Sequence, residues 1–389
     1  MATMRESVLS YLDGCREEML RLWETIVRLE TPSADAAAFS RLASHLDTYC
    51  DALGMETEKF QPQHAGLCLA ARTPSASLPP VLLLGHLDTV HPAGSFPGGP
   101  WRVEGDQVYG PGVHDCKGGL VIALYVIRAL LHAGYDRRQL RLVLLSDEET
   151  AHTLSQRQTV DFLQRHALGC GAAFTVESGL PGGEIITARK GGGILPLRVQ
   201  GIASHAGTAP EKGASAVLEA AKKIVAIHAL SDPAHVTYNC GIIHGGTSAN
   251  VVPDRCEVSV AIRFRTNQDH RQAMDALHEI CGRVETPGTV CTLGPLVGFP
   301  AMEELDKTAA LAKIYQDASE ALGLGRPGTA YSAGCSDSAY TASMGIPTLC
   351  AAGVLGEGQH SPHEHADLAS LLPQAKRLAN AILSLPDDF

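Results

Sequence analysis

Several apolar runs that end in histidine or acidic residues constrain the fold of this chain more than any other feature. The stretch VLLLGHLDTV, residues 81–90, has the pattern of a buried strand that passes directly into His86 and Asp88. The runs at 139–149 and 171–179 repeat this pattern and also end in acidic residues. Continuous apolar strands are typical of a sheet that is covered on both faces, and ligands bind beyond the carboxyl ends of such strands. The sequence therefore predicts an α/β sheet with chemistry at one edge.

Helical patterns alternate with these strands. Apolar residues at helical spacing predict helices over 7–30, 37–54, 118–135 and 306–323 and a last helix from about Leu368. Further strands are predicted at 66–72 and 347–353. This alternation predicts an α/β domain in which helices flank a mostly parallel mixed sheet.

The pattern changes at about residue 191. From there, strand-like segments alternate apolar and polar residues, which is typical of an antiparallel sheet with one exposed face. Helices are predicted at 213–230 and 269–284, and the α/β pattern resumes near residue 306. We therefore expect a first domain made of residues 1–190 and 303–389, with an inserted α+β domain at 191–302.

Composition excludes several classes of partner. The formal net charge is -11, and no run of lysine and arginine offers a surface for nucleic acid or for an anionic membrane. The apolar runs are too short to span a bilayer, and the opening MATMRESVLSYLDG does not resemble a secretory signal. The eleven cysteines form no CxxC pair, which indicates free thiols rather than a disulfide framework. We expect a cytoplasmic protein.

Short motifs at the predicted strand ends and loops carry the chemistry. In chain order they are GHLDTV, GPGVHDCKGG, SDEET, VESG and GQHSPHEH. Each alone has an ordinary explanation, such as a turn or a helix N-cap. Together and in this order they resemble the M20 family of zinc-dependent exopeptidases and deacylases over essentially the whole chain. The likeness is greatest to the glutamate carboxypeptidase branch, through these motifs and through ASHAG and SAN.

The resemblance implies a dinuclear metal site. His86 and Glu177 would bind one ion, Glu149 and His360 would bind the other, and Asp115 would bridge the two. Nitrogen and carboxylate ligands without thiols suit two Zn²⁺ ions per chain, with Co²⁺ or Mn²⁺ as possible substitutes. Two metals that share a carboxylate form a hydrolytic centre.

The same resemblance assigns the neighbouring residues. Asp88 would hold the His86 imidazole from behind, since alternate side chains of a strand share a face. Glu148 would be the general base. The peptide bond after Asp115 is expected to be cis. His363 and His365 lie in the same loop as His360 and remain alternatives to it as the metal ligand.

The insertion supplies further candidates by resemblance. His205 in ASHAG would reach across a dimer interface and stabilise the oxyanion in the partner's active site. Asn250 and Arg263 would bind the substrate carboxylate, because the planar guanidinium forms two parallel bonds to such a group. Arg265 is an alternative to Arg263 on the same face. The glycine-rich SAGCSDSAY resembles a loop that contacts substrate.

Two departures from the family pattern stand out. Thr150, Ala151 and His152 follow SDEE where the family commonly has small residues, so the pocket wall beside the catalytic glutamate is expected to differ. His114 precedes the bridging acid and would face away from it, as a supporting or solvent-facing residue rather than a ligand.

These features together predict a dinuclear zinc hydrolase that cleaves an amide bond next to a free carboxylate. The leading form is a homodimeric carboxypeptidase that acts on a small peptide and prefers a glutamate-like C-terminal residue. An N-acyl-amino-acid deacylase needs the same metals, base and carboxylate clamp, and an N-carbamoyl amidohydrolase is a weaker third. A non-catalytic binding protein would be expected to lack the base or a ligand, and this chain retains them.

Overall fold

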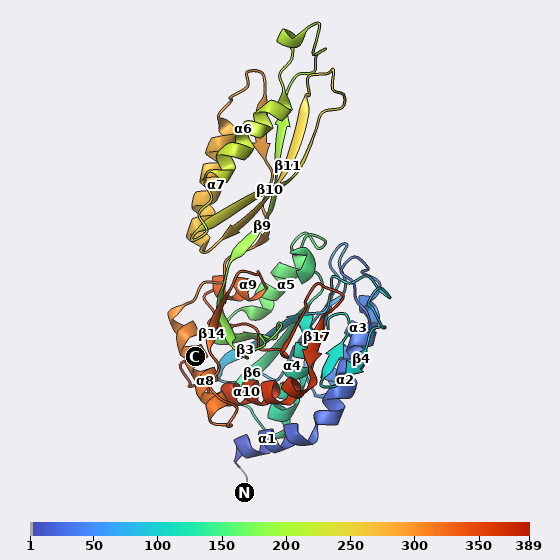
Figure 1. Ribbon diagram of the computed structural model, residues 1–389. Coiled ribbons are helices and arrows are strands. Elements are labelled where there is room, and N and C mark those ends of the chain that lie inside the picture. The colour runs from blue at the N-terminus through green and yellow to red at the C-terminus, as the bar shows by residue number, and fades with distance from the viewer. Residues whose placement is uncertain (1–2) are drawn as a thin grey trace. The chain divides into compact units, whose positions relative to one another are not determined.

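A six-stranded sheet forms the centre of the computed structural model, which describes residues 3–389. Across the sheet, the strands are β1 (Glu56–Phe60), β2 (Cys68–Arg72), β6 (Arg138–Leu145), β3 (Leu78–His86), β7 (Ala172–Thr175) and β15 (Thr348–Leu349). The last four run parallel, whereas β1 and β2 form an antiparallel edge. The expected α/β class with a mostly parallel mixed sheet is confirmed (Figure 1).

Helices cover both faces of this sheet. They are α1 (Met4–Gly14), α2 (Arg16–Arg28), α3 (Phe39–Ala52), α4 (Gly118–His132), α5 (Gln158–Ala167), α8 (Asp306–Glu320), α9 (Ser338–Ser343) and α10 (Leu371–Leu383). Val81 and Leu83 of β3 join an apolar cluster with α4, while Leu82 and Leu84, which point the other way, are equally buried. Burial on both faces explains why the β3 sequence is continuously apolar.

The N-terminal helical pattern differs from the expectation of one helix over 7–30. The chain forms α1 and α2 with a break at Cys15, whose N–H donates to the carbonyl of Leu12 instead of continuing the α-helical ladder. Gly14 precedes the break, and glycine is a poor residue for a helix interior. Both helices still bury their apolar faces, including Leu12 and Trp23.

A second sheet is formed by the middle of the chain. Its strands are β10 (Val236–Gly245), β11 (Arg255–Phe264), β9 (Gly191–Gln200) and β12 (Val290–Leu293) in spatial order, and β13 (Val297–Phe299) also pairs with β9. All neighbours are antiparallel. Helices α6 (Ala216–His228) and α7 (Asn267–Gly282) pack on this sheet (Figure 1).

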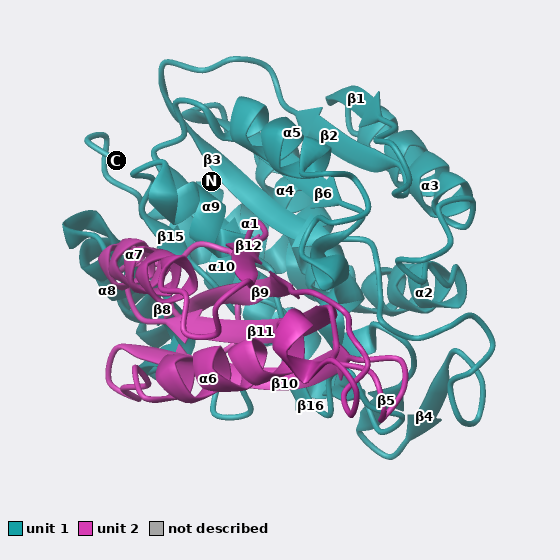
Figure 2. Cartoon of the chain, turned by 90° about the horizontal axis from the view of Figure 1, so that it is seen from above, with its two compact units in different colours: residues 1–188, 304–331, 336–389 teal, residues 189–303, 332–335 magenta. Residues whose placement is uncertain are grey.

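The chain divides into two compact units. Unit 1 comprises Met1–Ala188, Glu304–Tyr331 and Ser336–Phe389, and unit 2 comprises Arg189–Glu303 and Ser332–Cys335 (Figure 2). Unit 1 also holds a small sheet of β16 (Gly356–Glu357), β17 (His365–Asp367), β5 (Gln107–Tyr109) and β4 (Arg102–Glu104). Strands β8 (Ile185–Arg189) and β14 (Thr329–Ser332) form a pair where the chain passes between the units.

Two expectations from composition concern the whole described chain. No helix among residues 3–389 is both long enough and apolar enough to cross a membrane. All eleven cysteines are free thiols, and most of them are buried.

Candidate metal centre

The parallel strands place their carboxyl ends together. In the register of the sheet, His86 at the end of β3 lies beside Leu145 at the end of β6, and Leu84 lies beside Thr175 at the end of β7. The segments that follow these strands carry the acidic motifs. Glu148 and Glu149 are in a single 3₁₀ turn after β6, and Glu177 follows β7.

Histidine and carboxylate side chains converge at this edge. Nε2 of His86 lies 3.2 Å from Oδ1 of Asp115, and Nε2 of His360 lies 3.4 Å from Oδ2 of the same carboxylate. The ring of His360 also lies 3.0 Å from Oε2 of Glu149, and Nε2 of His86 is 3.8 Å from Oε2 of Glu177. Asp115 therefore directs one oxygen toward each histidine.

Asp88 lies on the opposite side of the His86 ring from Asp115. Nδ1 of His86 is 3.1 Å from the Asp88 carbonyl oxygen and 3.3 Å from its Oδ1. The Asp88 carboxylate also accepts hydrogen bonds from the backbone N–H groups of Glu148 and Glu149 and from the hydroxyl of Ser33. One buried carboxylate thus fixes the imidazole together with the turn that carries the two glutamates.

The loop that carries Asp115 is held by a residue that the sequence reasoning did not single out. Glu364 is 1% exposed and accepts hydrogen bonds from the N–H groups of Gly112, His114 and Asp115. The signal was present, because this glutamate closes the HSPHE pattern that pointed to His360. The Asp115–Cys116 peptide bond is cis, as the resemblance implied.

Several carboxylates lie close together at this edge of the sheet, and they shift the pKa values of Glu149, His360 and His86. The pKa of Glu149 rises to about 7, because the group is buried and faces Asp115. Hydrogen bonds to Asp115 and Glu149 raise the pKa of His360 to about 10. Burial lowers the pKa of His86, but the neighbouring thiol of Cys116 and the carboxylates raise it further, so the net direction is upward.

These residues fit a metal ion. Ligand atoms of His86, Asp115 and Glu149 all lie within 4.8 Å of one another. Imidazole nitrogens and carboxylate oxygens suit zinc and related divalent ions. Buried carboxylates are costly unless a cation balances them, and the upward pKa shift of Glu149 reports that cost. The site can therefore hold metal.

Glu148 sits beside this cluster with its side chain buried. Its pKa is raised, first by burial and then by the negative charges of Glu177, Asp337 and Glu149. A buried carboxylate with a raised pKa next to a metal site is a better proton acceptor than an ordinary glutamate and can also return the proton.

His152, one of the three residues that depart from the family pattern after SDEE, contacts two buried aspartates. The side chain is fully buried, with Nε2 2.7 Å from Oδ1 of Asp337 and Nδ1 3.2 Å from Oδ1 of Asp147. The two aspartates raise the pKa of His152 to about 9 against the effect of burial. Next to Asp337, the hydroxyl of Ser336 donates to Glu177. His152 thus connects Asp147, which precedes Glu148, with the Ser336–Asp337 segment, which contacts the candidate ligand Glu177.

The other histidines of these motifs lie apart from the cluster. His114 is buried, with Nε2 3.0 Å from the Gly179 carbonyl oxygen, so it does not face solvent. The ring of His365 lies tilted against the Tyr109 ring, with the ring centres 5.3 Å apart, and its Nδ1 faces the carbonyl oxygen of His363. Of the three histidines in the C-terminal loop, His360 is the one whose ring lies within 4 Å of Asp115 and Glu149.

Unit 2 brings His205 and Asn250 together. The carbonyl of Asn250 accepts from the N–H of Ala206, and His205 pairs with Val251 across a β-bridge. Nδ1 of His205 accepts from the N–H groups of Gly207 and Thr208. The ring proton of the neutral imidazole is therefore on Nε2, where it can be donated to a ligand.

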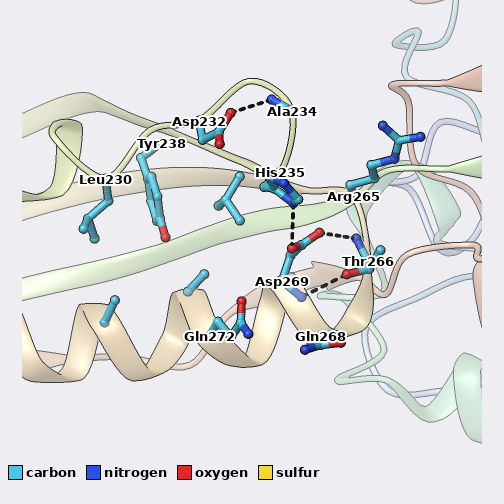
Figure 3. Close-up of a pocket in the computed structure, with 13 residues that line it drawn as sticks. Leu230, Asp232, Ala234, His235, Tyr238, Arg265, Thr266, Gln268, Asp269 and Gln272 are labelled. Carbon is cyan, nitrogen blue, oxygen red and sulfur yellow. Dashed lines mark hydrogen bonds and ion pairs between the residues drawn. The ribbon is translucent and has the colours of Figure 1, made fainter.

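Arg263 lies in β11 and Arg265 follows the end of that strand, and both are exposed. Burial raises the pKa of the Cys335 thiol, and the nearby positive charges of Arg263 and Arg189 oppose this rise, so the Arg263 guanidinium lies near the SAGC segment. Arg265 instead lines a cavity of about 740 Å³ in unit 2 (Figure 3). There Asp269 binds His235 and the N–H of Thr266, and all the lining residues belong to unit 2. The candidate metal ligands belong to unit 1, so this cavity is not part of that cluster.

Comparison with known proteins identifies relatives over most of the chain. The model of the family "Peptidase family M20/M25/M40" matches residues 82–384. Carboxypeptidase G2 from Pseudomonas sp. (strain RS-16) is 27% identical over 381 residues, which is 94% of this chain and 89% of that protein. A putative succinyl-diaminopimelate desuccinylase DapE from Mycobacterium tuberculosis (strain ATCC 25618 / H37Rv) is 29% identical over 343 residues, 83% of this chain and 92% of that protein.

Among solved structures, the M20 family metallo-carboxypeptidase Sso-CP2 from Sulfolobus solfataricus superimposes with a TM-score of 0.76. The two sequences are 17% identical, and the match covers 94% of this chain and 99% of that one. This likeness is one of fold.

Proposed function

The chain belongs to peptidase family M20/M25/M40 and is a hydrolytic enzyme, and from this premise we propose that it is a dinuclear zinc carboxypeptidase. In this proposal it cleaves an amide bond next to a free carboxylate and releases a C-terminal amino acid, glutamate-like in preference. Carboxypeptidase G2, similar over 94% of the chain, supports this form of the reaction. The non-catalytic alternative is set aside, because the chain retains Glu148 and every expected ligand.

The observation that carries the proposal is the position of Asp115 between His86 and His360, with Glu149 beside one histidine and Glu177 beside the other. In this arrangement each of two ions has one histidine nitrogen and one glutamate carboxylate of its own, and the carboxylate of Asp115 is shared by both. We assign His86, Asp115, Glu149, Glu177 and His360 as the ligands of two Zn²⁺ ions.

When bound, the ions would activate a water molecule and polarise the scissile carbonyl. Glu148 takes a proton from the attacking water and returns it to the nitrogen of the leaving amine. Its raised pKa, caused first by burial, suits both steps. Asp88 keeps the His86 ring in one orientation through its contacts with Nδ1.

Residues of the insertion complete the proposed site. Arg263 and Asn250 hold the carboxylate of the released amino acid, because a guanidinium and an amide both donate hydrogen bonds to it. His205 of a second copy donates Nε2–H to the developing oxyanion. The two backbone bonds to Nδ1 support this assignment, since they leave the proton on Nε2.

A homodimer is part of this proposal. β10 is the outermost strand of its sheet, with Ile242 54% exposed and Ile243 47% exposed. On α6, Val225 is 72% exposed and Leu218 is 50% exposed. An unpaired edge strand with apolar side chains favours pairing with another chain. The free thiols of all eleven cysteines suit a reducing compartment, and we propose a cytoplasmic enzyme.

An N-acyl-amino-acid deacylase is the second candidate. The similarity to a desuccinylase, 29% over 343 residues, favours it specifically. Both reactions leave a free amine next to a carboxylate, so the residues of the metal centre do not distinguish them.

Amine release from a panel of substrates tests the proposal. The panel contains N-acyl-glutamates, dipeptides, N-acetyl-amino acids and N-carbamoyl-amino acids, each with and without a zinc chelator. We expect chelator-sensitive release, fastest from substrates that end in glutamate. Release only from N-acetyl-amino acids would select the deacylase, and no release with added Zn²⁺, Co²⁺ or Mn²⁺ would contradict both candidates.

A further inference from the structure

A cavity of about 470 Å³ in unit 1 opens beside Glu149. Its walls are two loops, residues 32–35 after α2 and residues 89–93 after β3. The loops are joined by backbone hydrogen bonds from Thr89 to Thr31 and from Ser33 to Thr89. A volume of a few hundred Å³ on a fixed frame is typical of a site for a small molecule.

The surface of this cavity is mainly apolar. Its apolar lining residues are Pro32, Ala34, Val90, Pro92 and Ala93. Val90 is 40% exposed, although it is a large apolar side chain within two residues of the buried Asp88. An exposed apolar side chain next to a catalytic centre gains stabilisation when a ligand covers it.

The charged lining residues are both acidic. They are Glu149, which belongs to the metal-ligand cluster, and Asp35, which is exposed. No lysine, arginine or histidine is among the lining residues. Ser33 also lines the cavity, but its hydroxyl already donates to Asp88 at 2.8 Å. A carboxylate bound in this cavity would therefore meet Asp35 with no cationic side chain in the lining to balance it.

We propose that this cavity binds the acyl side of the substrate and selects an uncharged, apolar acyl group over an anionic one. The inference rests on the proposed function, in which the released amino acid carries a free carboxylate. Under that proposal Arg263 holds this carboxylate, whereas the cavity offers it no lysine, arginine or histidine side chain, so the cavity receives the other side of the scissile bond. Its position beside Glu149 places the acyl chain next to the reacting carbonyl.

Two substrates of equal shape test the charge preference. N-(4-methylpentanoyl)-glutamate and N-succinyl-glutamate differ in that two methyl groups of the first are replaced by the two oxygens of a carboxylate. With the metal-loaded enzyme, we expect kcat/KM for the first to exceed that for the second by about 10-fold or more. Equal values, or a preference for succinyl, would overturn the assignment of the cavity while leaving the hydrolase intact. Release from neither would overturn the proposed function itself.

The variant Asp35→Lys tests the residue that carries the charge. It adds a cation to the cavity wall, so the ratio of kcat/KM for the methylpentanoyl substrate to that for the succinyl substrate should fall by about 10-fold. Asp51→Lys, at an exposed position of α3 outside the cavity, should leave the ratio unchanged. Both substrates are cut by the same active molecules, so partial unfolding or metal loss cancels in the ratio. An unchanged ratio in Asp35→Lys would contradict the proposal.

The variant Val90→Trp tests the volume. A larger side chain at this exposed position should lower kcat/KM for the methylpentanoyl substrate by about 10-fold relative to N-formyl-glutamate, whose acyl group needs no cavity. Equal effects on both substrates would show that the acyl chain does not enter this cavity.

Discussion

Glu148 and Glu149 are neighbours in the chain, yet their surroundings differ. Glu149 lies 3.0 Å from His360 and near Asp115, whereas Glu148 faces other carboxylates, with Glu177 as the largest charge acting on it. The turn that carries both is held by Asp88 through two backbone N–H groups. One residue can thus bind metal while the other remains free to move a proton.

The first prediction concerns Glu148→Gln. The amide keeps the shape of the side chain but cannot accept the water's proton, so kcat should fall by about 10³-fold. Metal content measured by mass spectrometry should stay at the wild-type value, because Glu148 is outside the ligand cluster. Glu17→Gln, an exposed position of α2, serves as the control. Activity retained in Glu148→Gln would exclude its role as base.

The second prediction concerns His152, whose pKa of about 9 is raised by Asp337 and Asp147. A histidine with a raised folded-state pKa stabilises the fold fully below its ordinary value of about 6.5, and this stabilisation disappears as the pH rises through 9. The contribution at pH 6 is about 3 kcal/mol.

Urea unfolding of wild type and His152→Asn measures this effect. The difference in free energy of unfolding between the two proteins should be large at pH 6 and should shrink by pH 9.5. An equal difference at both pH values would show that the imidazole is neutral and stabilises the fold by packing alone.

Among the elements of unit 1, helix α4 owes its close packing to a glycine in its first turn, Gly119. A Cβ on Gly119 would lie 1.8 Å from the carbonyl oxygen of Val176, the residue before Glu177. The helix can therefore approach the segment that follows β7 only because this residue has no side chain. This contact connects the loop of Asp115, which precedes α4, with the segment that carries Glu177.

The third prediction concerns Gly119→Ala. The clash should reduce the free energy of unfolding by about 2 kcal/mol and should weaken metal binding, because the backbone before Glu177 must move. Chemical denaturation and metal titration measure the two effects. Gly14→Ala is the matched control, since nothing lies within 4 Å of a Cβ at that position. Wild-type metal affinity in Gly119→Ala would contradict the coupling.

Local patterns predicted the elements that carry the site. The apolar runs before His86, Glu148 and Glu177 correspond to β3, β6 and β7. The HSPHE pattern includes Glu364, but local patterns could not show that it supports the Asp115 loop, some 250 positions earlier in the chain. Contacts between residues so far apart in the chain leave no periodic pattern in the sequence from which they could be predicted. The His152–Asp337 pair is another contact of this kind. The predicted strand at 347–353 is only β15, Thr348–Leu349, because the following residues leave the sheet.

At the scale of the whole molecule, the proposed function depends on two units with different tasks. Unit 1 holds the candidate ligands and the base, and unit 2 holds His205, Asn250 and Arg263. In unit 2, every residue from 241 to 250 is exposed, including the apolar Ile242 and Ile243 of β10. The proposed dimer accounts for this exposure.

The fourth prediction concerns assembly. Sedimentation velocity should give twice the chain mass of 41.1 kDa. Ile243→Lys should yield a monomer with strongly reduced activity, because a charge on the edge strand opposes pairing and His205 would lose its target site. Val284→Lys, at a position of unit 2 that is 59% exposed and outside β10, should remain dimeric. A fully active wild-type monomer would remove the proposed role of His205 across the interface.

The proposed function requires two metal ions per chain for hydrolysis. Titration of the metal-free enzyme with Zn²⁺, with the rate of glutamate release from an N-acyl-glutamate as the readout, tests it most directly. We expect the rate to rise until two equivalents per chain are bound and then to level off. A rate that is independent of added metal, or one that is maximal at a single equivalent, would contradict the dinuclear centre.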